Sequence, residues 1–238
     1  MKDLRILAVI PMRGGSAGIP DKNIQDVEGA PLFSYILNTL LQVSEIERVV
    51  VSTDSEKYAE LARGLGANVP FLRPANLADG KTRLHYVMQH ALHESDALDG
   101  PYDAVLSALA TAPLVRADTV RSLIETMKQT DCEAVATGSP IKTGHPYLAK
   151  YLSEDGCASD VLSLPEGTPR YPRQVRPDTY FFNGCLFLRK RHLLEPPDDS
   201  TNALGIAPRM VVTSEPESLN IDDLEDLDRA RAFIKSAV

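Results

Sequence analysis

The hydrophobic positions of this chain alternate between short, uniformly apolar runs and longer segments with a helical period. The first run, 5–11, is apolar at every position after Arg5, which is typical of a strand buried on both faces. Other apolar runs predict strands at 48–52, 68–72, 103–109, 133–137, 185–188 and 209–213. The segments between the runs predict helices at 31–42, 55–65, 82–94, 118–129, 190–194 and 222–235.

Strands and helices that alternate through short connections predict an α/β protein with a mainly parallel sheet and helices on both faces. The alternation stops at 138–183, a stretch with six prolines and no clear helical period. We interpret this stretch as an arm inserted into a single domain that spans 1–238. A plain surface insertion is the alternative.

Composition and charge narrow the class of function. The 238 residues are 43% hydrophobic and 24% charged, and the formal net charge is −8. Nucleic acids and anionic membranes are usually bound by a basic face, so neither is an expected partner. Three cysteines without C-x-x-C spacing and the lack of a signal-peptide core predict a reduced, cytoplasmic protein. The charge is uneven, because 1–83 is neutral overall whereas 215–238 holds seven acidic and three basic residues.

A glycine-rich loop follows the first predicted strand, where parallel sheets bind their ligands. Gly14, Gly15 and Gly18 form the pattern G-G-x-x-G, which is neither the dinucleotide fingerprint G-x-G-x-x-G nor a P-loop. The missing fingerprint disfavours a dehydrogenase. Glycines let backbone N–H groups approach phosphates, and Arg13 and Lys22 supply the cationic charge that a triphosphate needs. A flexible turn without a ligand is the alternative.

The segment Arg13-Gly-Gly-Ser-Ala-Gly-Ile-Pro-Asp-Lys-Asn23 resembles the N-terminal signature of the acylneuraminate cytidylyltransferase (CMP-sialic acid synthetase) family. Four more segments match that family in order: 51–54, 71–78, 172–174 with 183–184, and 218–222. The resemblance implies a nucleotide-diphospho-sugar transferase-like fold. It also implies an Mg²⁺-dependent homodimer that joins CTP to an acidic keto-sugar of the sialic, legionaminic or pseudaminic acid type and releases pyrophosphate. The inserted arm would mediate dimerisation.

The resemblance also implies roles for individual residues. Arg13, Lys22 and Asp222 would be catalytic, and Asn220 with Asp222 would hold the metal. The nucleotide would be bound by Arg13, Gly14, Gly15, Ser16, Lys22, Asn23 and Arg73. Lys81 and Arg83 are added as nucleotide-binding residues from a segment that departs from the family, because at the start of a predicted helix they could supply further charge for the phosphates. The acceptor sugar would be bound by Thr111, Arg173, Gln174, Tyr180 and Asn183.

Several positions depart from the family pattern. The usual D-x-D of the metal segment reads Asn220-Ile-Asp222 here, and the lysine after Gly-Gly-Ser is Ala17. An amide oxygen can still ligate Mg²⁺ but brings no charge, and Asp222 could instead be a helix N-cap. The Q-P-T-S-P-L-R stretch reads L-A-T-A-P-L-V at 109–115. These changes leave open an octulosonate or phosphonate acceptor, or a non-catalytic nucleotide-binding paralogue.

Overall fold

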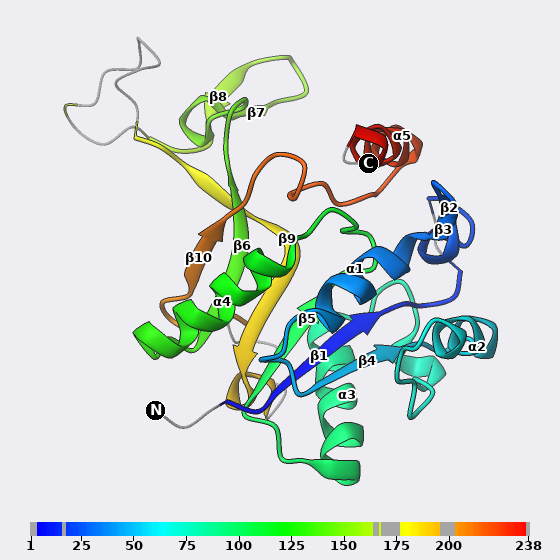
Figure 1. Ribbon diagram of the computed structural model, residues 1–238. Helices are drawn as coiled ribbons and strands as arrows, with labels where there is room; N and C mark the ends of the chain where they lie inside the picture. The colour runs from blue at the N-terminus through cyan, green and yellow to red at the C-terminus, as the bar shows by residue number, and fades with distance from the viewer. Residues whose placement is uncertain (1–3, 16–17, 164–166, 168–176, 196–202, 237–238) are drawn as a thin grey trace.

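The computed structural model describes residues 4–15, 18–163, 167, 177–195 and 203–236. Its centre is a six-stranded sheet in the order β10–β6–β9–β5–β1–β4 (Figure 1). The strands are β1 Ile6–Pro11, β4 Arg48–Ser52, β5 Ala104–Ala108, β6 Ala134–Pro140, β9 Tyr180–Lys190 and β10 Arg209–Val212. Only β9 runs antiparallel to its neighbours in this sheet, so the predicted mainly parallel sheet is confirmed.

Helices cover both faces of the sheet, as the alternating pattern predicted. On one face lie α1 Leu32–Leu41, α2 Glu56–Gly64 and α4 Ala117–Thr130, which enclose the larger hydrophobic core. On the other face, α3 Leu84–Asp99 and the 3₁₀ turn Arg191–Leu194 enclose a second core. The last helix, α5 Leu224–Ser236, packs through Leu227 and Ala230 against the loop that follows β1 and the start of α1. No helix in the described ranges is long and apolar enough to cross a membrane.

The prediction of a strand at 68–72 was wrong. That segment makes a single bridge to the sheet, between Asn68 and Val50. Pro70 has no backbone N–H to donate to a ladder, which explains why pairing does not continue. The segment still follows the edge of the sheet, because the Arg73 N–H donates to the carbonyl of Thr53 (2.8 Å). Arg73 therefore lies at the carboxyl end of the sheet although the segment before it is not a strand.

Some element boundaries also differ from the prediction. Helix α3 continues to Asp99, five residues beyond its predicted end, and α5 begins at Leu224 rather than at 222. Two small strands, β2 Asp26–Val27 and β3 Ala30–Pro31, form a hairpin before α1, where no strand was predicted, and Pro31 belongs to β3 and not to the predicted helix.

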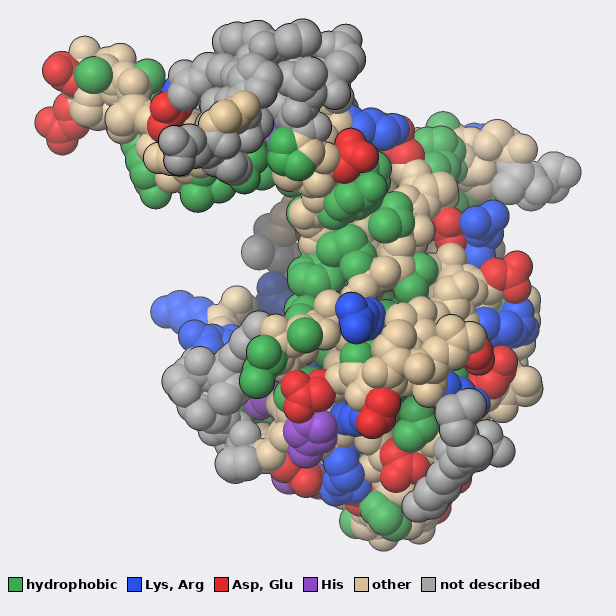
Figure 2. Space-filling view, turned by 90° about the vertical axis from the view of Figure 1, so that its left-hand side faces the viewer, with side chains coloured by type: hydrophobic (Ala, Val, Ile, Leu, Met, Phe, Trp, Pro, Cys, Tyr) green, Lys and Arg blue, Asp and Glu red, His purple; other side chains and the backbone are tan. Residues whose placement is uncertain are grey.

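The interrupted stretch 138–183 is an extension of the antiparallel pair β6 and β9. Residues 138–140 of β6 pair with 182–180 of β9, and a two-stranded unit, β7 Lys150–Leu152 with β8 Ala158–Asp160, lies beyond them (Figure 1). Antiparallel neighbours need no crossover helix, which explains why the β-α rhythm stops here. The arm exposes large apolar side chains, and Figure 2 shows hydrophobic groups gathered on and beneath it.

Candidate functional site

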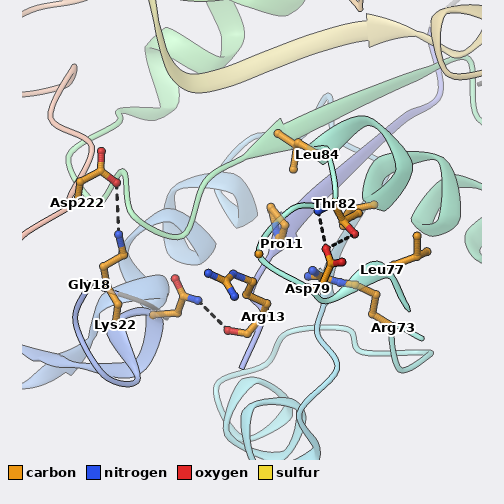
Figure 3. A pocket seen from close by; sticks show the side chains of 13 residues that line it. Pro11, Arg13, Gly18, Lys22, Arg73, Leu77, Asp79, Thr82, Leu84 and Asp222 are labelled. Carbon is orange, nitrogen blue, oxygen red and sulfur yellow. Dashed lines mark hydrogen bonds and ion pairs between the residues drawn. The ribbon is translucent and has the colours of Figure 1, made fainter. Parts of the chain in front are cut away.

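A cavity of about 400 Å³ opens at the carboxyl ends of β1 and β4. It brings together five of the residues predicted for nucleotide or metal binding: Arg13, Lys22, Asn23, Arg73 and Asp222. In Figure 3, Lys22 and Asp222 lie at one end of this cavity and Asp79 and Arg73 at the other, with Arg13 between them. These five residues thus share a single hollow, although they come from chain segments far apart in sequence.

Arg73 is a buried cation at this cavity, with 5% of its surface exposed. Its guanidinium donates to the hydroxyl and the carbonyl of Ser52, and no carboxylate among the described residues forms an ion pair with it. Burial lowers the pKa of Arg73 to about 10, although the nearby Asp54 acts in the opposite direction. Taking an unpaired guanidinium out of water costs free energy, so this position favours an anionic ligand.

The glycine-rich loop is attached to the ends of β1 and β4. The Gly14 N–H donates to Asp54 Oδ1 (2.9 Å), and the Asn23 amide donates to the carbonyl of Arg13 (3.3 Å). Gly14 and the buried Asn23 therefore shape the loop in this structure. Both were predicted to contact the nucleotide, and Asn23 also lines the first cavity. Gly15 has a φ of +68°, which favours glycine at this position. Ser16, predicted to bind nucleotide, lies outside the described residues.

Lys22 joins this loop to the C-terminal segment. Its ammonium donates to the carbonyl of Ile221 (2.6 Å) and forms an ion pair with Asp222 (3.4 Å). Gly18 allows the close approach, because a Cβ there would lie 3.1 Å from the carbonyl oxygen of Asp222. The side chain of Asp222 is 77% exposed, whereas that of Lys22 is 14% exposed. Lys22 and Asp222, two of the three predicted catalytic residues, thus lie at the same end of the cavity, and the third, Arg13, lies nearer its middle (Figure 3).

The predicted metal segment is held by Thr111. The Thr111 hydroxyl donates to Asn220 Oδ1 (2.5 Å), and the Ile221 N–H donates to the Thr111 carbonyl (2.9 Å). Thr111, expected to contact the acceptor sugar, thus supports the metal segment. No group of three or more acidic, histidine or cysteine residues within the described chain could hold a metal ion. The donors present suit an Mg²⁺ that brings water and phosphate ligands with it, since Mg²⁺ commonly uses only one or two carboxylates.

The turn before α3 forms the opposite wall of the cavity. Asp79 Oδ1 accepts hydrogen bonds from the N–H groups of Lys81 and Thr82 and from the Thr82 hydroxyl, and these bonds lower the pKa of Asp79. Asp79 and Thr82 line the cavity, although the sequence pattern had pointed to Lys81 and Arg83 instead. The Asp-x-x-Thr spacing of an Asx turn is the signal that could have identified them.

A second cavity of about 880 Å³ lies at the base of the arm. Its walls are Ser139, Pro140, Ile141, Lys142, Thr143, Phe181, Thr213, Ser214, Glu215, Ser218 and Arg229. The segment 218–222 connects the two cavities, because Ser218 lines this one and Asp222 lines the first. Four residues of extended chain span at most about 14 Å, so the two cavities are neighbours.

The predicted acceptor residue Asn183 does not line this second cavity but holds two residues that do. Its amide donates to the hydroxyls of Ser139 (3.0 Å) and Thr213 (2.9 Å), both of which line the cavity, and its oxygen accepts from Thr137 (2.7 Å). Tyr180 is not among the lining residues, although its neighbour Phe181 is. The other two predicted acceptor residues, Arg173 and Gln174, lie outside the described part of the chain.

Glu217 anchors the segment between the cavities, and no sequence signal pointed to it. It is 3% exposed and accepts hydrogen bonds from Thr119 (2.5 Å), Ser214 (2.8 Å) and Arg116 (3.0 Å). Burial alone would raise the pKa of Glu217, but these three hydrogen bonds together lower it. Glu217 therefore fixes the C-terminal segment to α4.

A model of the cytidylyltransferase family matches residues 7–151. The chain belongs to this family. A pseudaminic acid cytidylyltransferase from Campylobacter jejuni is 38% identical over 240 residues, which cover 98% of this chain and 97% of that protein. The family resemblance found in the motifs is thereby confirmed, and the chain is a nucleotidyltransferase of the acylneuraminate cytidylyltransferase family.

Other relatives match a smaller share of this cytidylyltransferase. The CMP-N,N'-diacetyllegionaminic acid synthase of Legionella pneumophila is 38% identical over 138 residues, which cover 58% of this chain and 59% of that protein. An N-acylneuraminate cytidylyltransferase of Streptococcus agalactiae is 27% identical over 190 residues, 79% of this chain and 44% of that protein. This chain thus aligns with less than two thirds of either relative.

Solved structures confirm the predicted fold class. A CMP:2-keto-3-deoxy-manno-octonic acid synthetase complexed with CTP superposes with a TM-score of 0.74 at 19% identity, covering 98% of this chain and 100% of that chain. A 4-diphosphocytidyl-2C-methyl-D-erythritol synthase from Anaerococcus prevotii has a TM-score of 0.66 at 16% identity, with the same coverage. At these identities the likeness concerns the fold alone.

Proposed function

We propose that this cytidylyltransferase transfers CMP from CTP to a nine-carbon keto-sugar acid of the pseudaminic or legionaminic type, with Mg²⁺, and releases pyrophosphate. The full-length match to a pseudaminic acid cytidylyltransferase carries this proposal. The first cavity supports it, because Arg13, Lys22 and Arg73 surround a hollow at the carboxyl end of the sheet. Three cations there suit a triphosphate.

In this reaction the anomeric hydroxyl oxygen of the sugar acid forms a bond to the α-phosphorus of CTP. The bond from that phosphorus to the oxygen bridging it to the β-phosphate breaks, pyrophosphate leaves with the electron pair, and the hydroxyl proton is released to water. Arg73 and Arg13 hold the phosphates and stabilise the charge that develops on the leaving group. Lys22 exchanges its contact with Asp222 for the triphosphate.

Asp222 and Asn220 are the residues that would contact Mg²⁺. When bound, Mg²⁺ neutralises phosphate charge and helps to orient the triphosphate. Asp222 supplies a carboxylate at the edge of the first cavity, and Asn220 supplies an uncharged oxygen two residues away. This donor pair complements a cation that is already coordinated by phosphates.

The second cavity is the acceptor half of the proposed site. Arg229 and Lys142 can bind the sugar carboxylate, and Glu215 and the hydroxyls supported by Asn183 can bind sugar hydroxyls. Lys142 is paired with Glu215 at 2.6 Å, whereas the ion pair of Arg229 with Asp226 is longer, at 3.6 Å, so Arg229 is the cation that a carboxylate ligand can recruit more easily. The apolar walls suit acyl methyl groups, and about 880 Å³ accommodates a nine-carbon sugar.

The decisive assay mixes the purified protein with CTP, Mg²⁺ and a panel of pseudaminic, legionaminic, sialic and octulosonic acids and a phosphonate acceptor, and measures pyrophosphate. Turnover with the pseudaminic or the legionaminic acid is the expected result. Selective turnover of sialic acid, the octulosonate or the phosphonate would reject the proposed acceptor. CTP binding without turnover of any acceptor would favour a non-catalytic nucleotide-binding paralogue, for which the uncharged Asn220 is the motivating feature.

Replacing Arg229 by glutamine tests the acceptor half separately. Loss of a charge-assisted contact of about 1.5–3 kcal/mol raises the KM for the sugar acid roughly 10- to 150-fold, whereas the Kd for CTP does not change. Arg231→Gln is the matched control, because Arg231 lies on the same helix and also pairs with an aspartate three residues earlier, as Arg229 does, but does not line the cavity. Equal KM values for the two variants would exclude Arg229 as the carboxylate ligand.

The proposed assembly is a homodimer formed through the arm. Tyr151 and Leu152 of β7 are 64% and 73% exposed, and Phe182 and Val212, which both pair with Gly138, are 38% and 54% exposed. Apolar surface concentrated in this way suits a protein partner (Figure 2). Leu152→Asp should shift sedimentation toward the monomer, whereas Leu98→Asp, at the exposed end of α3, should not. A monomeric wild-type protein would reject the dimer.

A further inference from the structure

The Asn220 carboxamide has a fixed orientation in this structure. The Thr111 hydroxyl donates to its oxygen, and the adjacent Ile221 N–H returns a hydrogen bond to the Thr111 carbonyl. An amide oxygen has two lone pairs, so accepting one hydrogen bond leaves one lone pair for a cation. Thr111 lies just after β5, in the loop 109–112, whose Ala112 N–H closes a turn onto the Leu109 carbonyl. The hydroxyl is therefore held by a rigid support.

The nearby carboxylate already has a cationic partner. Asp222 is paired with Lys22, and the Lys22 ammonium is held in place by its shorter bond to the Ile221 carbonyl. The charges of Asp222 and Lys22 cancel, and Asn220 adds none. The neighbouring Asp226, which accepts a hydrogen bond from the Asp222 N–H, is itself paired with Arg229 (3.6 Å). A divalent cation that approached the protein alone would meet a neutral group of ligands and would have to compete with an ammonium.

We propose that the divalent cation enters this site only as its complex with the nucleotide, and that Thr111 is the positioning residue that orients Asn220 toward it. This inference rests on the proposed function, since it takes CTP as the nucleotide. The triphosphate supplies the negative charge that Asn220 lacks and draws the Lys22 ammonium away from Asp222. One carboxylate and one oriented amide oxygen then complete the coordination of a cation that keeps its waters and phosphate ligands.

The sequence departure from D-x-D thus has a consequence for the order of binding. A carboxylate at position 220 would give the free protein two acidic ligands beside one lysine, for a net charge of −1. Asn220→Asp should therefore create a cation site that exists without nucleotide. The substitution changes one amide to an isosteric carboxylate, which can still accept the Thr111 hydrogen bond.

The experiment uses Mn²⁺ as a paramagnetic probe and measures water-proton relaxation, which rises when the ion is bound to the protein. The wild type with Mn²⁺ alone should give no enhancement at millimolar Mn²⁺, and adding CTP should produce it. Asn220→Asp should give enhancement with Mn²⁺ alone. Calorimetry with CTP in the presence of a chelator gives the metal-free nucleotide affinity of every variant.

Thr111 is tested by a pair of variants. Thr111→Val removes the hydroxyl and retains the backbone contacts, and its affinity for Mn²⁺–CTP should fall about 10-fold, as is common when a group orienting a metal ligand is lost. Thr111→Ser retains the hydroxyl and should restore wild-type affinity. The affinity for metal-free CTP should be the same in all three proteins, which a general loss of structure would not allow.

Two results overturn the inference while the proposed function stands. One is Mn²⁺ binding to the free wild type that is lost in Asp222→Asn. The other is equal Mn²⁺–CTP affinity in Thr111→Val and Thr111→Ser. A protein that binds no CTP, with or without metal, overturns the inference together with the proposed function, and the metal-free calorimetry identifies that case.

Discussion

Replacing Arg73 by methionine tests whether this buried cation serves to bind the ligand or to stabilise the fold. Methionine has a similar length and no charge, so it fills much of the same space. Arg73 is 5% exposed and has Ser52 as its side-chain hydrogen-bond partner. We expect the variant to bind CTP more weakly than the wild type and to have a free energy of unfolding at least as large.

The expected size of the stability change follows from the pKa of Arg73. Burial lowers this pKa to about 10, a fall of roughly two and a half pH units at about 1.4 kcal/mol each, or about 3 kcal/mol against the charged form. Loss of the bonds to Ser52 offsets about 1–2 kcal/mol of that gain. The free energy of unfolding should therefore rise by about 1–2 kcal/mol, which corresponds to about 2–8 °C in Tm for a protein of this size.

The pH dependence provides a check on this reasoning. A base with a lowered folded pKa is destabilising wherever it is charged in both states, which here means below about pH 10. Above that pH the unfolded chain retains the Arg73 proton while the folded chain releases it, so stability from this group rises with pH. The difference between Arg73→Met and the wild type should thus be constant from pH 5 to about 9.

The affinity of Arg73→Met for CTP should fall, although its stability rises. A charge-assisted hydrogen bond to a phosphate is worth about 1.5–3 kcal/mol, so the Kd for CTP should rise roughly 10- to 150-fold by calorimetry. Arg189→Met is the matched control. Arg189 is 4% exposed, burial lowers its pKa to about 10, and it pairs with Val105 near the amino end of β5, away from the cavity. This control should also gain stability but should bind CTP as the wild type does.

The reasoning would be refuted by an Arg73→Met protein that loses more than about 2 kcal/mol of stability and binds CTP normally. That outcome would make Arg73 a structural residue that holds the end of β4. A loss of CTP affinity in Arg189→Met of the same size would also refute it. The effect would then follow from removing any buried charge and not from a contact with the ligand.

Other positions give further tests. Glu217→Gln should lower the free energy of unfolding by about 2–3 kcal/mol at pH 7 in urea melts, because three hydrogen bonds to a buried carboxylate are weakened. Since the folded pKa of Glu217 is lowered, its stabilisation is present above the ordinary pKa and lost as the pH falls through the folded value, so the difference should shrink by pH 3. Gly18→Ala should destabilise the contact with Asp222 by about 1 kcal/mol and weaken Mg²⁺–CTP binding, because its Cβ would lie 3.1 Å from a carbonyl oxygen. Gly64→Ala, where an added methyl meets no atom within 4 Å, should instead stabilise the helix by about 0.5–1 kcal/mol.

The sheet and its helices were predictable because each element carries its own hydrophobic period. Strand β1 and helix α4 are recognised without any long-range information, since burial on one or both faces is encoded locally. The prediction of a strand at 68–72 was wrong because it, too, used only local information. Its composition suits a strand, but Pro70 and a single bridge at Asn68 decide its structure, and pairing is a long-range property.

The candidate site was predictable where a motif lies in one short loop. Arg13 and Lys22 belong to a single segment, and the structure places both at the first cavity. The function of Asn183 as a support for two hydroxyls depends on Ser139 and Thr213, which are more than 25 residues away in sequence on either side. No spacing rule reports such a contact, so the family resemblance pointed to Asn183 but not to the way in which it acts.

Thr111 and Asn220 show the same limit at the metal segment. The hydroxyl and the carboxamide are 109 residues apart, yet their hydrogen bond occupies one lone pair of the Asn220 oxygen and leaves the other for a cation. Compared with the D-x-D pattern, the sequence alone shows that Asn220 removes one negative charge. The structure adds that the remaining oxygen is oriented and that Asp222 is neutralised by Lys22. A site that is neutral when empty and oriented when filled suits a cation that arrives already bound to phosphates, so the substitution changes the order of binding without removing the ligand.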